Sequence, residues 1–238
     1  ISNNDFKNIK QIFNKNNINI KKIFIKKFIE GTQLINQNNY TENFFKIEIG
    51  KNNSHIYFFE KSSLKYVESF QFGTNIIVKD IVKVCSIHHE TVENILSDGF
   101  IEHNNFDNNE LLEEKYFINE NYRKIRKKLI KDIADARIDE ITNIILNKNV
   151  NLRSFKKNYG TIFLIIKDKR ILDNFKENFK SNFSQNINFK PTFINDLEVN
   201  SIIMNTAKIL VQGWKKEAIP MTQTKNSLIT RIFKSLFG

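Results

Sequence analysis

The spacing of apolar residues predicts one helix and one strand at the start of the chain. Between Asp5 and Asn14 the apolar side chains recur at the period of an α-helix. Residues Lys22–Phe28 hold the apolar run Ile23–Ile25 between lysines, which we interpret as a strand.

Three further strands are predicted in succession. Phe45–Ile49 alternates, the chain turns through Gly50–Ser54, and the apolar run Ile56–Phe59 follows, which predicts a hairpin. A second turn at Glu60–Ser63 leads into Leu64–Phe70. We therefore expect an antiparallel meander.

The middle of the chain has the helical period. Apolar side chains at this spacing predict one helix over Ile76–Val84 and a second over Val92–Leu96, which ends before Gly99. Residues 101–121 are acidic, rich in Asn and without a period. A long helix over Tyr122–Leu146 then presents the apolar stripe of a core helix, which consists of Ile130, Ala134, Ile138, Ile141 and Ile145.

Strand and helix alternate again toward the end. Thr161–Ile166 has the pattern of a strand, Leu172–Phe183 that of an amphipathic helix, and residues 198–212 that of a last core helix. Gly213 follows directly, where a glycine cap is expected. Residues 214–226 contain Pro220 and lack an apolar period, so we expect a linker.

The composition is that of a folded protein. Hydrophobic residues make up 40% of the 238-residue chain, which excludes a mainly disordered protein. The single cysteine, Cys85, excludes an internal disulfide and fits a reducing compartment. No run approaches the roughly 18 apolar residues that span a bilayer, so we expect any membrane contact to be peripheral. The chain starts with Ile1 and shows no signal segment, which we interpret as a fragment without its true start.

The formal net charge of +11 permits nucleic acid, an anionic membrane or an acidic protein as partner. The dense basic cluster Arg123–Lys131 shares its apolar positions with the predicted core and offers no exposed aromatic residues for base stacking, so we expect no nucleic acid. His88 and His89 are adjacent and lack the spacing of helical ligands, so we expect no metal site there.

Four segments carry motifs. They are Ile-Glu-Ile-Gly-Lys-Asn-Asn-Ser at 47–54, Gly-Thr-Asn-Ile-Ile-Val-Lys-Asp-Ile at 73–81, Ile-Ala-Asp-Ala-Arg-Ile-Asp-Glu-Ile at 133–141, and Ser-Leu-Ile-Thr-Arg-Ile-Phe-Lys-Ser-Leu-Phe-Gly at 227–238. Together they resemble the FtsA family of actin-like bacterial cell-division proteins. The first is placed like the family's Asp-Ile-Gly-Gly-Gly-Thr phosphate hairpin, and the last resembles its terminal membrane anchor. The resemblance implies an α/β, actin-like (ribonuclease H-like) fold, of which this chain would be the distal half, with a C-terminal amphipathic helix.

The same resemblance implies how the chain is divided. Residues 1–70 and 155–213 would build the sheet subdomain (actin-like 2A) and residues 71–154 the helical subdomain (2B). The linker 214–226 would then lead to a membrane-binding helix at 227–238.

By resemblance, ATP and Mg²⁺ would be the cofactors, and the nucleotide site would consist of Glu48, Gly50, Asn53, Gly73, Glu93 and Lys167. Several positions depart from the family pattern. Lys51-Asn52-Asn53 replaces Gly-Gly-Thr, although a backbone wraps phosphate closely only where side chains are absent. Glu48 replaces a shorter Asp, Glu93 lacks a Lys three residues later, and Lys167-Asp168 replaces Gly-Gly. We therefore expect weak or absent nucleotide binding and no catalytic residue, and phosphate pairing by Lys51 or Lys167 stays open.

The last twelve residues have the pattern of an interfacial helix. One face would hold Leu228, Ile229, Ile232, Phe233, Leu236 and Phe237, flanked by Arg231 and Lys234. Burying about six such side chains at roughly 1 kcal/mol each outweighs an ordering cost of a few kcal/mol, so we expect reversible binding to an anionic membrane. The alternative is a helix docked on the protein's own core.

The resemblance implies a protein that tethers FtsZ polymers to the inner face of the cytoplasmic membrane at the division septum, with self-association as a further property. Its contacts with acidic FtsZ residues would come from Lys79, Arg123, Arg126 and Lys127. An actin-like ATPase or filament protein of another role is the alternative, and a basic nucleic-acid-binding module is the less favoured one.

Overall fold

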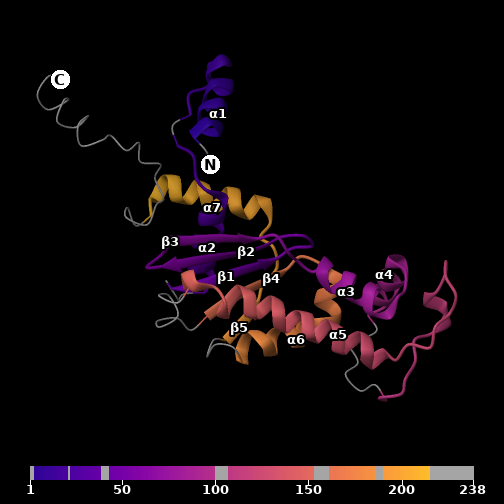
Figure 1. Ribbon diagram of the computed structural model, residues 1–238. Helices are drawn as coiled ribbons and strands as arrows, with labels where there is room; N and C mark the ends of the chain where they lie inside the picture. The colour runs from indigo at the N-terminus through magenta and orange to yellow at the C-terminus, as the bar shows by residue number, and fades with distance from the viewer. Residues whose placement is uncertain are drawn as a thin grey trace, which may run out of the picture.

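A mixed five-stranded sheet lies between two layers of helices in the computed structural model, which describes residues 3–20, 22–38, 43–99, 107–152, 161–185 and 190–214 (Figure 1). The strands are β1 (Phe44–Ile49), β2 (Ser54–Glu60), β3 (Ser63–Phe70), β4 (Thr161–Ile166) and β5 (Lys190–Phe193). The α-helices are α1 (Asn3–Lys15), α2 (Lys26–Asn38), α3 (Asn75–Cys85), α4 (His89–Ser97), α5 (Lys127–Thr142), α6 (Lys169–Gln185) and α7 (Val199–Gln212). Short turns of other helix types cover Glu114–Tyr116, Asn143–Asn147 and Val150–Leu152.

The strand order is β3-β2-β1-β4-β5. The meander is confirmed, because β1 pairs antiparallel with β2, and β2 with β3. β4 pairs parallel with β1, and β5 with β4. The carboxyl ends of β1 and β4 therefore meet at one edge of the sheet, where Ile49 lies opposite Ile166. This edge positions the candidate site.

Each face of the sheet builds its own core. On one face the alternating side chains Phe45, Ile47 and Ile49 of β1 pack with buried residues of α3, α4, α5 and α6. On the other face Phe44 packs with residues of α2 and α7. Figure 1 shows α7 and α2 on one side of the sheet and α3 to α6 on the other. The same alternation that buries three apolar side chains under α3 to α6 turns Lys46 and Glu48 toward α2.

The apolar stripe predicted for the long helix is confirmed, since all five of its side chains are buried. The helix begins at Lys127 rather than at Tyr122, so its predicted start was wrong. The backbone N–H groups of Leu112 and Lys127 donate to Ile125 and Glu110, both at 2.8 Å. These bonds hold the segment before α5 in a strand-like bridge with the chain that precedes it, which a helix would break.

The strand predicted over Lys22–Phe28 was also wrong. Residues 22–25 have no regular structure, and α2 begins at Lys26. Ion pairs hold its first turn against β1. Lys27 and Glu30, three residues apart on one face of the helix, pair with the buried Glu48 and Lys46. The sequence also missed β5, a four-residue edge strand that contains Pro191. An edge strand tolerates proline, but its short length leaves almost no pattern.

The other elements predicted up to residue 212 are confirmed with small shifts in their ends, whereas the predicted linker beyond Trp214 and the predicted helix 227–238 lie outside the described residues. Gly213 follows α7 with φ 81°, as expected of a glycine after a helix. One core cluster joins the sheet to α3, α4 and α5, and the subdomain division at residues 71 and 155 stays a prediction. None of the helices within the described residues is long and apolar enough to cross a membrane.

Candidate functional site

Glu48 is buried in a network of four charged side chains between β1 and α2. Lys27 donates hydrogen bonds to both carboxylate oxygens of Glu48, at 2.7 and 2.9 Å, and Lys46 donates to Oε1 at 2.7 Å. Glu30 completes the network, since Lys27 donates to its Oε2 at 2.9 Å and Lys46 pairs with the same oxygen. Two ammonium groups thus face two carboxylates. Charged side chains can be buried in this way because each is paired with a group of opposite charge.

The network fixes the charge of Glu48. Burial opposes ionisation, but the ammonium groups of Lys46 and Lys27 outweigh it and lower the pKa of Glu48 to about 2. Burial likewise opposes the charge on Lys27, yet its hydrogen bonds to Glu48 and Glu30 raise its pKa. Next to them, burial and then the charge of Glu48 raise the pKa of Tyr57 to about 12. Glu48 therefore stays ionised throughout the physiological range.

The hairpin turn after β1 is closed by the segment that starts α3. The backbone N–H groups of Thr74 and Asn75 donate to the carbonyls of Gly50 and Lys51, each at 2.9 Å. A Cβ on Gly73 would lie 2.1 Å from the Gly50 carbonyl oxygen, so only glycine permits this close approach. The structure thus brings the predicted residues Gly50 and Gly73 into direct contact.

A series of hydrogen bonds and ion pairs links the segment that closes this hairpin to α4. The hydroxyl of Thr74 donates to Asp168 at 3.2 Å, and Arg170 donates to both Asp168 oxygens at 3.1 Å. Arg170 also forms an ion pair with Glu93. Asp168 is only 2% exposed, and its carboxylate accepts from both neighbours. Glu93 is therefore held by α6 on the far side of Asp168, and no described contact joins it to Glu48.

Lys167 directly follows β4 at the carboxyl end of the strand, and it is exposed to solvent. Its backbone N–H donates to Ile49 at 2.9 Å, which continues the β1–β4 pairing. Its Nζ lies 3.7 Å from Glu48 Oε2 and 3.8 Å from Asp196 Oδ2. The side chain is 42% exposed, so these are loose pairs at the surface. Lys167 and the exposed Asn53 are the predicted site residues that face solvent most.

The donor set at this edge does not fit a magnesium–nucleotide complex. Both oxygens of Glu48 already accept ammonium hydrogens from Lys27 and Lys46, so a divalent cation would have to displace these ammonium groups. The Thr74 and Asn75 amides point at hairpin carbonyls rather than into open space. Among the described residues, no group of three or more His, Cys, Asp or Glu side chains gathers as metal ligands would.

The predicted partner-binding residues lie on α3 and around the start of α5. Lys79, Arg123 and Arg126 are exposed. Lys127 is mostly covered and pairs with Glu110 at 2.5 Å, so it supports the bridge before α5. All eight predicted membrane-binding residues lie outside the described residues.

Sequence reasoning missed Lys27, Glu30 and Lys46 as partners of Glu48. A signal was present in β1, where charged side chains at 46 and 48 alternate with large apolar ones. Such a strand buries both faces in the structure, and a buried charge requires a partner of opposite sign. The partners on α2 could not be named, because that segment was predicted as a strand.

No protein-family model matches the sequence, and no curated protein matches it. Solved structures do match. MreB 5 of Spiroplasma citri bound to AMPPNP aligns with a TM-score of 0.50 at 14% identity, over 89% of this chain and 66% of that one. The chain has an actin-like fold.

Two further solved structures align with lower TM-scores. The archaeal actin homolog Ta0583 aligns at 12% identity and a TM-score of 0.47, over 77% of this chain and 54% of that one. The ethanolamine utilization protein EutJ from Carboxydothermus hydrogenoformans aligns at 10% identity and a TM-score of 0.46, over 76% of this chain and 53% of that one. The chain thus spans about half to two thirds of the length of the actin-like proteins it matches.

Proposed function

We propose that this chain belongs to an actin-fold adaptor that holds a partner at a membrane surface and does not hydrolyse nucleotide. The observation that carries the proposal is the engagement of Glu48, the residue placed where the FtsA family has its magnesium-linked aspartate. Its carboxylate accepts hydrogen bonds from Lys27 and Lys46 at 2.7 to 2.9 Å. Recruiting magnesium there would require breaking a buried, neutral network.

The rest of the sheet edge supports the same reading. In a phosphate-binding turn, backbone N–H groups are free to point at the anion. Here the N–H of Gly50 donates to its own turn, at Asn53, and the amides of Thr74 and Asn75 donate to the turn's carbonyls. Asp168 and Arg170, in turn, are tied to Thr74 and Glu93. Internal bonds thus satisfy the groups that a nucleotide would need.

The partner we propose is polymerised FtsZ, and the attachment we propose is the apolar tail 227–238. The exposed guanidinium groups of Arg123 and Arg126 and the ammonium of Lys79 suit an acidic peptide. Lys127 contributes less, because its ammonium already pairs with Glu110. The adaptor would then act at the inner face of the cytoplasmic membrane, at the septum.

Calorimetric titration with magnesium ATP tests the loss of nucleotide function. We expect no saturable heat up to about 1 mM ATP, which corresponds to less than roughly 4 kcal/mol of binding free energy. Circular dichroism and a thermal unfolding curve of the same sample control for folding. A micromolar dissociation constant would contradict the proposal and would favour the second candidate described below.

Charge reversal tests the partner. Arg123→Glu with Arg126→Glu should weaken binding of an acidic FtsZ carboxyl-terminal peptide at least tenfold, measured by fluorescence anisotropy. The matched control is Lys7→Glu with Lys65→Glu, two exposed lysines outside this region that change the net charge equally. Equal loss in both variants would mean that only net charge matters, and no loss in either would remove this surface from the proposal.

The second candidate is a nucleotide-dependent, filament-forming protein. The observation in its favour is the fold itself, because MreB 5 was solved bound to AMPPNP. Lys167 also presents a partly exposed ammonium at the sheet edge, where it can pair with a phosphate.

A further inference from the structure

Helix α7 carries apolar side chains on both of its faces. Its inner face packs on α2 through the buried Ile209, and the Asn205 amide there donates to the Ile29 carbonyl at 3.0 Å and to Thr32 Oγ1 at 2.9 Å. Its outer face exposes large apolar side chains, which are Val199, Ile203, Met204, Leu210 and Val211.

The outer side chains are strongly exposed for their type. Ile203 is 58% exposed, Met204 62% and Val211 86%. They fall at i, i+1 and i+8, and together with Val199 and Leu210 they form one wide stripe along α7. A long exposed apolar stripe on a helix marks a docking surface.

We propose that the tail 227–238 is the segment that covers this stripe, so that the chain masks its own membrane-binding face when no membrane is present. The inference rests on the proposed membrane role of the tail. Both surfaces have the same need, since the tail's six apolar residues and the stripe on α7 would otherwise face water. Packing one on the other removes both apolar surfaces from water without any change in the fold of the described residues.

The length of the chain permits this contact. The described chain ends at Trp214, directly after α7, where the indole N–H donates to the Ser62 carbonyl at 3.2 Å. The 14 residues of α7 extend about 21 Å, and a twelve-residue helix about 18 Å. The intervening residues 215–226 reach at most about 40 Å. The tail can therefore fold back and lie antiparallel along α7.

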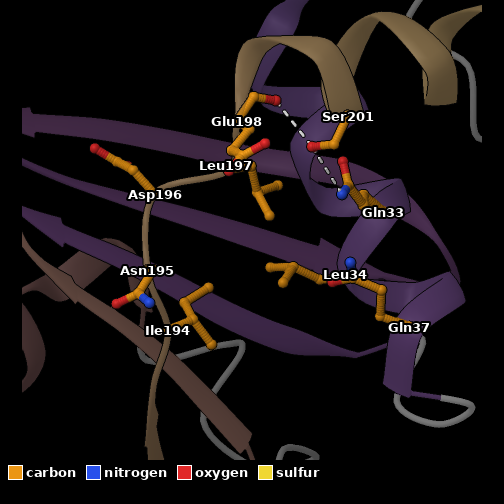
Figure 2. A pocket seen from close by; sticks show the side chains of 9 residues that line it. All are labelled: Gln33, Leu34, Gln37, Ile194, Asn195, Asp196, Leu197, Glu198 and Ser201. Carbon is orange, nitrogen blue, oxygen red and sulfur yellow. Dashed lines mark hydrogen bonds between the residues drawn. The ribbon is translucent and has the colours of Figure 1, made fainter.

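A pocket lies beside the amino-terminal end of α7, on the side that faces α2. Figure 2 shows the side chains that line it. Its volume is about 400 Å³. Its apolar lining is Leu34 of α2 with Ile194 and Leu197 of the loop before α7. Its other six lining residues are polar and none of them belongs to the stripe, so the pocket is a separate feature beside α7.

Membrane and α7 would then compete for one helix. The membrane binds only the released tail, so its apparent affinity is reduced by the fraction of chains in which the tail is free. If one chain in ten is free, removing the docking site raises membrane affinity about tenfold.

Cross-linking tests the contact directly. In a Cys85→Ser background, Val211→Cys with Ile229→Cys should form an intramolecular bismaleimide cross-link in buffer, and vesicles with anionic lipid should suppress it. The control pair is Lys65→Cys with Ile229→Cys, because Lys65 is exposed on β3 rather than on α7. A yield no higher than that of the control would overturn the proposal. So would a cross-link found only between two molecules, which would assign the stripe to a second copy of the chain.

Vesicle flotation of the full chain with Ile203→Gln and Val211→Gln gives an independent readout. We expect stronger membrane binding than wild type, whereas Val67→Gln, at an exposed apolar position on β3, should change nothing. Unchanged binding would overturn the masking proposal, and weaker binding would instead place α7 itself on the membrane. If wild type fails to float while the cross-link forms, the membrane role fails and the docking stands.

Discussion

Lys46 and Glu48 lie two residues apart on the same face of β1, and the Lys46 ammonium donates to Glu48 Oε1 at 2.7 Å. Lys46 is 1% exposed and Glu48 2%. Such a pair is stable only as part of a complete network, which Lys27 and Glu30 of α2 supply. The network therefore both fixes the position of α2 and removes Glu48 from ligand chemistry.

Removing Glu48 should destabilise the protein strongly. In Glu48→Ala, Glu30 is the one carboxylate of the network left to neutralise two ammonium groups, those of Lys46 and Lys27, and Lys46 stays buried. We therefore expect the free energy of unfolding to fall by about 3 to 5 kcal/mol. Urea denaturation measures it. The control is Glu177→Ala, which removes an exposed carboxylate 3.4 Å from Lys180 and should cost less than about 1 kcal/mol. Similar losses in both would contradict the buried network.

The same carboxylate predicts a pH dependence. The folded-state pKa of Glu48 is about 2, against 4.5 for an unperturbed Glu. A lowered pKa adds stability above the unfolded value and loses it as pH falls through the folded value, so the loss runs from about pH 4.5 down to about 2. The shift corresponds to roughly 3 kcal/mol. Urea unfolding from pH 6 to 2 should give a shallower decline for Glu48→Gln than for wild type, and parallel curves would contradict this.

Gly73 should tolerate no side chain. In Gly73→Ala the new Cβ would lie 2.1 Å from the Gly50 carbonyl oxygen and 2.7 Å from the Lys51 carbonyl carbon, both backbone atoms. Relieving such overlap costs about 1 to 3 kcal/mol or more. Gly99→Ala is the control, since it has φ +64° but nothing within 4 Å, and should cost about 1 kcal/mol through backbone strain alone. Thermal unfolding of both variants decides, and equal costs would rule out the contact.

Cys85 should react slowly with thiol reagents. It is 9% exposed, and burial raises the pKa of its thiol, so little reactive thiolate is present near neutral pH. We expect labelling by an aromatic disulfide reagent to follow unfolding rather than to occur in the native state. Rapid labelling of the folded protein, at the rate seen in denaturant, would show that this part of α3 opens easily.

The sequence predicted the parts of the fold that repeat a period. Long apolar stripes such as that of α5 and alternating strands such as β1 can be recognised in the sequence, because their apolar side chains recur at the period of the element. The sequence-based prediction failed where tertiary contacts determine the secondary structure. The segment 22–28 is rich in Ile and Phe, as strands are, but Lys27 forms its ion pair with Glu48 from the helix that begins at Lys26.

The residues of the candidate site likewise fall into those that the sequence predicts and those that it does not. Gly50 and Gly73 could be named from motifs, and the structure places them in contact. The partners of Glu48 and the Thr74–Asp168–Arg170 chain could not be named, because they join residues up to 94 positions apart. Only the folded chain shows which charges meet.

The measurement that tests the central claim most directly is flotation with anionic liposomes of the full chain and of a chain that ends at Asn226. We predict that the full chain floats, that the truncated chain does not, and that magnesium ATP changes neither result. Equal flotation of the two chains, or flotation of neither, would contradict a membrane adaptor anchored by residues 227–238.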